Sequence, residues 1–304
     1  MPFNHIPWTS FDASTTSMKN IPVRRIPSTQ TEPQFTENFT IRDLKEVLAG
    51  KDMVQELHRH DYFFILAVEK GKGKHEIDFI PFPVKDHVVF ILRPGQVHQL
   101  TLKAGSKGYL VQCQPEFLSL FDKTSIQLLR KASSNNLFQV NAKSFHRLLS
   151  PLSSIFKEYT DRKEGYQEII KANLAIFMIE LVRNRQHRTI PTAPVPPYPQ
   201  ERFEELTGLL EKDIFNHKQV AYYAEQLHLS PYQLNAITKA ASGKTCSELI
   251  NEHIILEARR YLLATTNQVN EIAFHLGYED VSYFIRFFKK HTGHSPASFR
   301  QAFR

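Results

Sequence analysis

Three histidines have the type and spacing of residues that bind a transition metal or a small polar ligand. His58 and His60 stand two residues apart in HRHDYF, so both point to one face if this segment is a strand, and His98 follows a Pro-Gly turn. Neutral imidazole is a common metal ligand and also takes part in hydrogen bonds. A complete metal site would add an oxygen ligand, but phenylalanine and isoleucine stand four and five residues after His60. We therefore expect these histidines to bind a small molecule, with no metal ion, no other cofactor and no catalytic residue.

Short strands are predicted around these histidines. Residues 62–80, YFFILAVEKGKGKHEIDFI, read as two strands joined by a Gly-Lys-Gly turn, and residues 87–102, HVVFILRPGQVHQLTL, as two more joined at Pro-Gly. Several short antiparallel strands in succession predict a small barrel. Its interior would be lined by Phe63, Ile65, Phe79, Phe90 and Leu92. These side chains indicate an apolar or aromatic ligand, although they could equally fill a core without one. The predicted ligand-binding residues are the three histidines with Phe63, Phe79 and Phe90.

Two helices are predicted after the barrel. In residues 142–188 the period of the apolar residues changes from 2 to 3.6, with one stripe through SFHRLLSPLSSIFKEYT and another through YQEIIKANLAIFMIELVRNRQHR. One helix would cover the barrel. Leu174 and Phe177 on the second stripe would contact another copy of the chain or anchor their helix to the barrel. Residues 189–200, TIPTAPVPPYPQ, hold five prolines, which predicts an extended linker without helix.

The C-terminal third contains one pattern twice. VAYYAEQLHLSPYQLNAITKAASG begins at Val220, VNEIAFHLGYEDVSYFIRFFKKHTG begins at Val269, and each reads as helix, tight turn, helix. Ser230 and Asp280 are placed to cap the second helix of each copy, and Gly277 offers the permissive backbone of a turn. One helix of about 30 Å is predicted between the copies, close to the ~34 Å of one DNA turn. In the helix-turn-helix motif, the second helix enters a major groove of DNA. The duplicated unit would therefore place two helices in successive major grooves.

Residues 201–304 resemble the DNA-binding domain of the AraC/XylS family of transcription activators. Residues 271–300, EIAFHLGYEDVSYFIRFFKKHTGHSPASFR, carry the most specific part of this resemblance. The HxH and PxGxxH pieces of the barrel resemble cupin motifs, and regulators of this family often carry such an N-terminal barrel. The resemblance implies DNA contacts from the two reading helices. The implied residues are Tyr232, Gln233, Asn235, Ala236, Lys239, Val281, Ser282, Ile285, Arg286, Lys289 and Lys290.

Together these patterns predict an α+β protein of two domains. Residues 1–188 would form a cupin-like β-barrel with a helical hairpin that senses a ligand and dimerises. Residues 189–200 would form the proline-rich linker. Residues 201–304 would form an all-α domain with two helix-turn-helix units joined by a long helix. A chain of 304 residues with 41% hydrophobic residues is long enough to bury two cores.

Charge and cysteine content narrow the class of protein. The formal net charge of +7 suits a polyanionic partner, but residues 200–304 hold 12 Lys and Arg against 12 Asp and Glu. Contacts to phosphate should therefore be local, at residues 281–304, which contain no acidic residue. The two cysteines, Cys113 and Cys246, indicate buried thiols in a reducing compartment. Without a signal pattern or an apolar run of about 20 residues, the chain is predicted to be cytoplasmic and to have no membrane contact.

Three functions are compatible with parts of these patterns. The first is a ligand-responsive, sequence-specific transcription regulator, predicted to be an activator that works with RNA polymerase as a homodimer on double-stranded promoter DNA. The second is a cupin-type metal-dependent enzyme with a helical appendage, which the missing acidic ligand disfavours. RNA binding would call for exposed aromatic platforms, whereas the aromatic residues here fall on core faces of helices. We predict the regulator, with an effector of unknown identity and no enzymatic activity.

Overall fold

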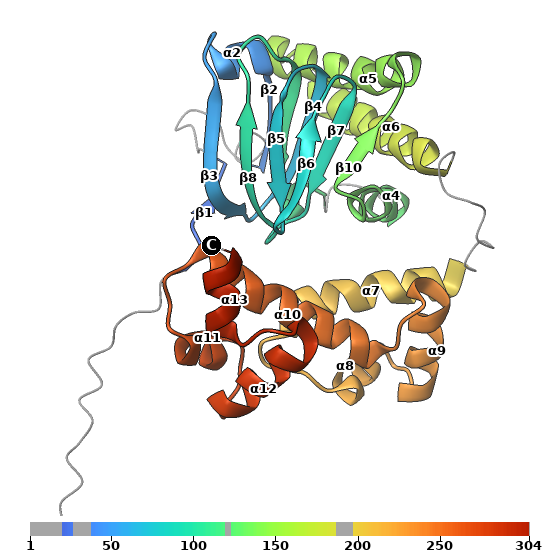
Figure 1. The fold of residues 1–304 in the computed structure, drawn as a ribbon. Helices are drawn as coiled ribbons and strands as arrows, with labels where there is room; N and C mark the ends of the chain where they lie inside the picture. Colours follow the sequence, from blue (N-terminus) through green and yellow to red (C-terminus); the bar gives the residue numbers. More distant parts are fainter. Residues whose placement is uncertain (1–19, 27–37, 119–122, 187–196, 304) are drawn as a thin grey trace, which may run out of the picture.

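The computed structural model describes residues 20–26, 38–118, 123–186 and 197–303 (Figure 1). Within these ranges, the N-terminal part forms two five-stranded sheets, with strand orders β1-β3-β8-β5-β6 and β10-β7-β4-β9-β2. The strands are β1 Val23–Arg24, β2 Phe39–Asp43, β3 Met53–His60, β4 Phe63–Lys70, β5 Gly73–Ile77, β6 Ile80–Val84, β7 Val88–Leu92, β8 Val97–Leu102, β9 Lys107–Cys113 and β10 Leu137–Gln139. The predicted α+β class with an N-terminal β-rich domain is confirmed.

Alternation along the strands divides the apolar residues of this domain between two cores. On β4, Phe64 and Leu66 belong to the core between the two sheets, whereas Ile65 and Ala67 belong to the core between the second sheet and the helices. The predicted helical hairpin is α5 Ala142–Asp161 and α6 Tyr166–Gln186, which pack on each other and lie with α4 Lys123–Ser133 along that sheet (Figure 1). Short helices α2 Leu44–Leu48 and α3 Pro115–Leu118 complete the domain.

Two of the expected barrel-lining assignments are wrong because of this alternation. Phe63 and Ile65 lie on the face of β4 that packs toward the helices. Phe90 and Leu92 do lie between the two sheets. Phe79 lies in the turn between β5 and β6, with φ of +68°, and packs against the C-terminal domain. A sequence pattern shows which residues share a face but not which face meets the interior.

Of the two roles predicted for Leu174 and Phe177 on α6, contact with a second copy or anchoring to the barrel, the structure supports the second. Leu174 and Phe177 are 2% and 0% exposed, in the core that their own chain forms with the second sheet. They therefore anchor α6 to the barrel and do not reach a second copy of the chain.

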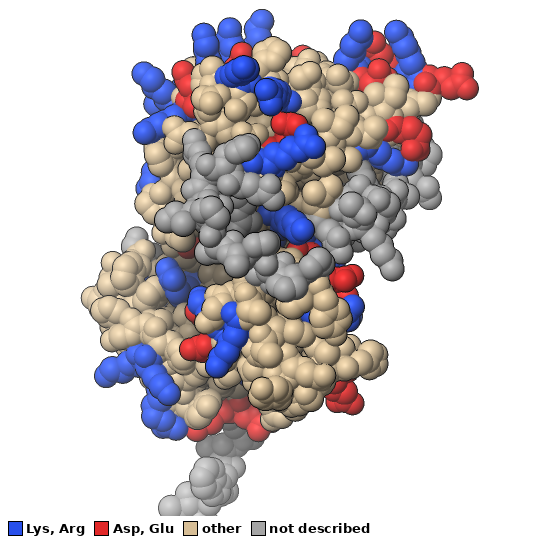
Figure 2. Space-filling model, turned by 90° about the vertical axis from the view of Figure 1, so that its right-hand side faces the viewer, with Lys and Arg blue, Asp and Glu red and all other residues tan. Residues whose placement is uncertain are grey.

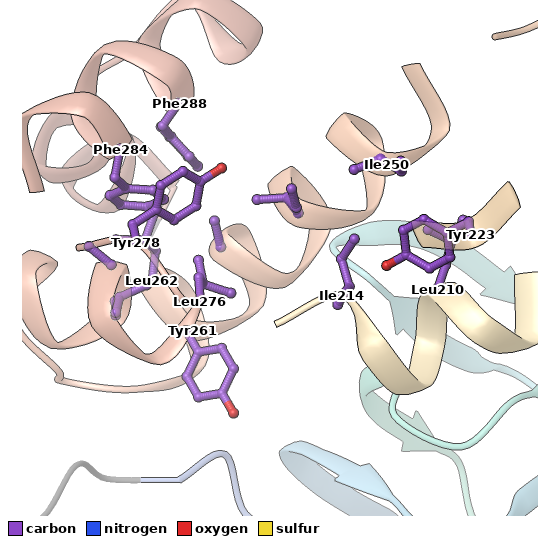
Figure 3. Close-up of a cluster of buried hydrophobic side chains, with 14 of the residues drawn as sticks. Leu210, Ile214, Tyr223, Ile250, Tyr261, Leu262, Leu276, Tyr278, Phe284 and Phe288 are labelled. Carbon is purple, nitrogen blue, oxygen red and sulfur yellow. The ribbon is translucent and has the colours of Figure 1, made fainter. Parts of the chain in front are cut away.

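Seven helices form the C-terminal domain over residues 197–303. They are α7 Pro197–Asp213, α8 Val220–Gln226, α9 Pro231–Ser242, α10 Cys246–Ala264, α11 Val269–His275, α12 Val281–Thr292 and α13 Pro296–Phe303. Figure 3 shows part of their common core, with Tyr223 and Ile250 toward one end and Leu262, Phe284 and Phe288 toward the other. Both predicted helix-turn-helix units, α8–α9 and α11–α12, are present, and α10 joins them as one continuous helix.

The proline-rich stretch is a partial correction. Residues 189–196 lie outside the described residues, but residues 197–200 form the first turn of α7, where no helix was expected. Proline is compatible with the first turn of a helix because the backbone N–H groups there have no partner inside the helix.

The turns of both reading units follow the sequence signals. Ser230 and Asp280 cap α9 and α12, and Gly277 has φ of +72°. A Cβ at Gly277 would lie 2.0 Å from the carbonyl oxygen of Phe215, so this turn requires glycine for space as well as for backbone conformation. None of the described helices is long and apolar enough to cross a membrane. Cys113 and Cys246 are both buried, as predicted.

Candidate functional site

Caps fix the starts of the two reading helices. At α9, Ser230 Oγ accepts a hydrogen bond from the Gln233 backbone N–H at 3.2 Å, and Gln233 Oε1 accepts one from the Ser230 N–H at 2.9 Å. At α12, the Asp280 carboxylate accepts a hydrogen bond from the Ser282 N–H at 2.7 Å. These bonds satisfy backbone donors that have no partner inside a helix. The caps therefore define where each reading helix begins.

Most of the predicted DNA-contact residues lie on the exposed faces of α9 and α12. Tyr232 is 84% exposed, the largest exposure among the large apolar and aromatic side chains of the described residues. The other exposed members of the set are Gln233, Ala236, Lys239, Ser282, Arg286, Lys289 and Lys290. Val281 and Ile285 are half-buried and pack against the core of the domain, so their main contacts are with the protein itself. The exposed groups could reach base edges or phosphates.

Two members of the set already hold parts of the domain together. Gln233 closes the capping box of α9. Asn235 Oδ1 accepts a hydrogen bond from the backbone N–H of Cys246 at 2.9 Å, and thereby joins α9 to the first turn of α10. We therefore assign Asn235 a structural role. The sequence pattern did not single out Tyr283 on α12, a residue that is 54% exposed, because it stands beside the buried phenylalanines of the same motif.

On the face of the molecule drawn in Figure 2, charge of one sign does not form a single large patch. Figure 2 shows basic and acidic side chains interspersed over one side of both domains. In α12 the last turn contains Lys289, Lys290 and His291. Arg286 lies 3.9 Å from the Asp280 carboxylate, with both side chains more than half exposed, so this ion pair is weak and Arg286 can exchange it for another anion. A phosphate contact at α12 would therefore be local.

Four buried histidines cluster between the two sheets. His58 and His60 on β3, His75 on β5 and His98 on β8 are at most 4% exposed. These strands are neighbours in the order β3-β8-β5, and His98 pairs with His58 on one side and Ile77 on the other. The sequence predicted that three of the four would lie together and missed His75, which has no HxH or Pro-Gly signal near it.

The rings form a connected set of hydrogen bonds. His75 Nε2 is 2.8 Å from His98 Nδ1, and His98 Nε2 is 2.8 Å from His60 Nε2. His58 Nδ1 donates to the carbonyl oxygen of Glu56 at 2.6 Å. Phe64 stacks parallel to the His60 ring, with 5.3 Å between the ring centroids. The cluster is thus held in place by strand pairing, hydrogen bonds and aromatic contacts.

Burial keeps these imidazoles neutral. Loss of water lowers the pKa of His58 to about 4 and the pKa of His60 and of His75 to about 3, and it lowers the pKa of His98 well below its ordinary value. Each ring therefore has one N–H and one lone pair at neutral pH. Such a set can bind a ligand through hydrogen bonds or through lone pairs.

A second polar cluster joins the barrel to the C-terminal domain. The Arg260 guanidinium on α10 donates from Nε to Asp78 Oδ1 at 2.7 Å and from Nη2 to Asp78 Oδ2 at 2.8 Å. Arg260 also pairs with Glu257 on its own helix. Asp78 Oδ1 accepts a further hydrogen bond from the Val97 backbone N–H at 3.2 Å. Although burial favours the neutral form, Asp78 and Glu257 raise the pKa of Arg260, so the group stays charged.

Apolar contacts surround this ion pair. Ile21 and Val97 are fully buried in the same cluster as Ile254 and Leu262 of α10, and the ring of Phe79 packs against that cluster. We call this set, together with Asp78, Glu257 and Arg260, the barrel–α10 contact. Its ion pair is only 7% and 12% exposed at the Arg260 and Asp78 side chains, which makes loss of one partner costly.

Comparisons with known proteins agree with both halves of this description. Residues 50–175 match the model of the AraC-like ligand binding domain, and residues 223–302 match that of a helix-turn-helix domain. The transcriptional activator RhaR of Mannheimia succiniciproducens is 23% identical over 81% of this chain and 87% of its own length. The activator RhaS of Pectobacterium atrosepticum is 27% identical over 81% and 88%. The crystal structure of unsaturated fatty acid bound ToxT from Vibrio cholerae matches with a TM-score of 0.38 and 16% identity over 86% of this chain and 95% of that one.

The structural role of Asn235 can be tested by two substitutions. Asn235→Ala removes the acceptor for the first turn of α10, which should lower the free energy of unfolding by about 1 kcal/mol. Asn235→Asp keeps an oxygen acceptor and adds a negative charge near a helix N-terminus, which should preserve stability. Thermal unfolding and selection of preferred DNA sites would be measured on both variants. An Asn235→Ala protein of unchanged stability but altered site preference would instead make Asn235 a base-reading residue.

Proposed function

This chain belongs to the AraC family of transcription regulators, and we propose that it controls promoters by reading DNA with α9 and α12 under the control of a small molecule bound in the barrel. It is a DNA-binding regulator with a ligand-binding domain. The observation that carries the proposal is the pair of capped helix-turn-helix units on one rigid connector.

The length of α10 suits two successive grooves of one DNA duplex. Its 19 residues span about 28 Å at 1.5 Å per residue, near the ~34 Å of one DNA turn. Both units pack on α10 through buried residues, so their separation is fixed by the core. The exposed starts of α9 and α12 would then enter grooves on the same side of the duplex.

We assign specificity and anchoring to different side chains. Arg286 is exposed and carries the planar fork that pairs with guanine, and Tyr232 offers an exposed ring and hydroxyl. Lys239, Lys289 and Lys290 would neutralise phosphates, which fix position and not sequence. Because acidic and basic residues balance in residues 200–304, the non-specific electrostatic part of the affinity should be modest.

The effector would be sensed in the histidine cluster and its signal carried by the barrel–α10 contact. His98 follows Val97 on β8, and the Val97 N–H is bonded to the carboxylate that holds Arg260. A ligand that moves β8 would therefore shift the anchor of the helix between the two reading units. This requires that the ligand bind the two arrangements with different affinity.

Dimerisation is proposed through the outer face of α6. Ile169 and Ile176 are 42% and 50% exposed, and Ala172 between them is exposed as well. These residues fall on one side of a helix at spacings of three and four. A second copy of the chain would cover this apolar stripe and bring a second DNA-binding domain near the promoter, which raises the effective affinity.

We further propose that the protein is an activator that contacts RNA polymerase and has no enzymatic activity. The two relatives described above are transcriptional activators, and both are matched over most of their length. A cupin-type enzyme remains the competing function for the N-terminal domain alone. An enzyme of that type would have no use for the two capped helix-turn-helix units of the C-terminal domain.

The DNA-reading assignment is tested by replacing one predicted base contact and one predicted phosphate contact. Arg286→Ala should relax the preference at one base pair, equivalent to about 1–3 kcal/mol of discrimination. Lys290→Ala should weaken binding to all sequences alike and reduce the salt dependence by about one counterion. Site selection and affinity at two salt concentrations would separate the two effects. Absence of duplex binding at low salt by the unsubstituted chain would refute the function itself.

The dimer face is tested by charge on the exposed stripe. Ile176→Asp should give a folded monomer with weaker promoter occupancy, because a carboxylate cannot be buried unpaired between two copies. Val54→Asp, at a β-branched apolar side chain that is 70% exposed on β3, is the matched control and should remain a dimer. Sedimentation at promoter-binding concentrations would be compared for the three proteins. Monomeric unsubstituted protein, or an Ile176→Asp dimer, would rule out this interface.

A further inference from the structure

The protonation of His58 can be deduced from its hydrogen bond. A carbonyl oxygen only accepts, so the 2.6 Å contact with Glu56 places the proton of His58 on Nδ1. Nε2 of the same ring therefore carries a lone pair. This nitrogen is buried and has no hydrogen-bond partner among the described residues. A buried lone pair without a partner is costly and calls for a ligand.

The other three rings cannot remove this deficit. In the chain His75, His98, His60, each neutral ring donates one hydrogen bond at most, and the two contacts of 2.8 Å use the facing nitrogens. Among the described residues, Nδ1 of His60 and Nδ1 of His75 have no partner that meets hydrogen-bond geometry. Whichever way the hydrogen bonds run, one of these two is an unmatched donor and the other an unmatched lone pair.

Ring nitrogens of His58, His60 and His98 converge. One nitrogen from each lies within 4.8 Å of the other two, and all three residues are buried. A tetrahedral ion with nitrogen ligands at 2.0–2.1 Å requires separations of about 3.3 Å. The rings would close on the ion by small side-chain rotations, since strand pairing already places His58 opposite His98.

The surrounding groups match the outer contacts of metal-binding histidines. Such ligands usually donate a hydrogen bond from the N–H of their second ring nitrogen to a backbone carbonyl or another side chain, which fixes the ring. The backbone carbonyl of Glu56 is such a partner for Nδ1 of His58. Nε2 of His75 is such a partner for Nδ1 of His98. Three imidazoles with one open position are a known ligand set for zinc, so the acidic ligand missing from the sequence is not essential. The residues present therefore fit a metal.

We propose that His58, His60 and His98 form a three-imidazole site for a divalent transition-metal ion, with His75 as the residue that positions His98. Neutral nitrogen ligands favour zinc, nickel, copper or iron over magnesium or calcium. The open position would be free for an oxygen or nitrogen atom of a small ligand. The expectation from the sequence was that no metal binds here. The site concerns the barrel alone and stands whether or not the DNA-reading proposal holds.

Cobalt(II) is a suitable probe because its visible spectrum reports ligand geometry. The full-length chain, freed of metal by a chelator, should bind one cobalt ion per chain, with a spectrum of nitrogen and oxygen ligands and no thiolate charge-transfer band. Zinc should displace the cobalt and raise the midpoint of thermal unfolding, since the ion binds the folded state. The absence of stoichiometric binding, or a thiolate band from Cys113 or Cys246, would overturn the proposal.

Variants separate the site from other histidines. His58→Ala and His60→Ala should each abolish stoichiometric binding, and His75→Ala should weaken it about 10- to 100-fold through loss of an outer contact. His146→Ala, at an exposed histidine on α5, is the matched control and should bind normally. Circular dichroism of the metal-free proteins would show that each variant folds. If His58→Ala and His60→Ala both failed to fold, the cobalt spectrum of the unsubstituted chain would still decide the outcome. Folded cluster variants that bind cobalt as tightly as the unsubstituted chain would refute the assignment.

Discussion

The buried ion pair between Asp78 and Arg260 is the contact on which the arrangement of the two domains depends. Loss of the Arg260 guanidinium, which is 7% exposed, would leave the carboxylates of Asp78 and Glu257 without their cation in the interior, at a cost of about 3–5 kcal/mol. Asp78 cannot be moved freely either, because its carboxylate also accepts from Val97 and Gln96 and its backbone has φ of +47°. The end of the barrel and the connector helix α10 are therefore fixed to each other.

This constraint links the sensor and the reader through a short path. The histidine cluster lies on β3, β5 and β8, and β8 begins at Val97, one residue before His98. On the other side, α10 packs against both helix-turn-helix units. A ligand or metal that repositions His98 by a fraction of an ångström would act on a packed contact that has few alternative arrangements. Such contacts tend to switch between discrete states and do not deform gradually.

Local signals in the sequence predicted the parts of this structure that depend on neighbouring residues. Ser230, Asp280 and Gly277 identified the two turns because caps and positive φ are set within a few residues. Because His58 and His60 are two residues apart, the sequence also predicted that they share one face of a strand. What could not be predicted depends on pairing across the chain. The partner of Arg260 is 182 residues away, His75 joins the cluster only through strand order, and the interior face of β4 depends on where α5 and α6 pack.

Control of DNA binding by the barrel through Asp78 and Arg260 is tested most directly by a double-mutant cycle on promoter affinity. Neither residue lies on the exposed faces of α9 or α12, so an effect on DNA binding must pass through their contact. Asp78→Ala, Arg260→Ala and the double variant should all shift promoter affinity by a similar amount, with a coupling free energy of about 1–3 kcal/mol. Folded single variants with unchanged affinity, or effects that simply add in the double variant, would contradict the account.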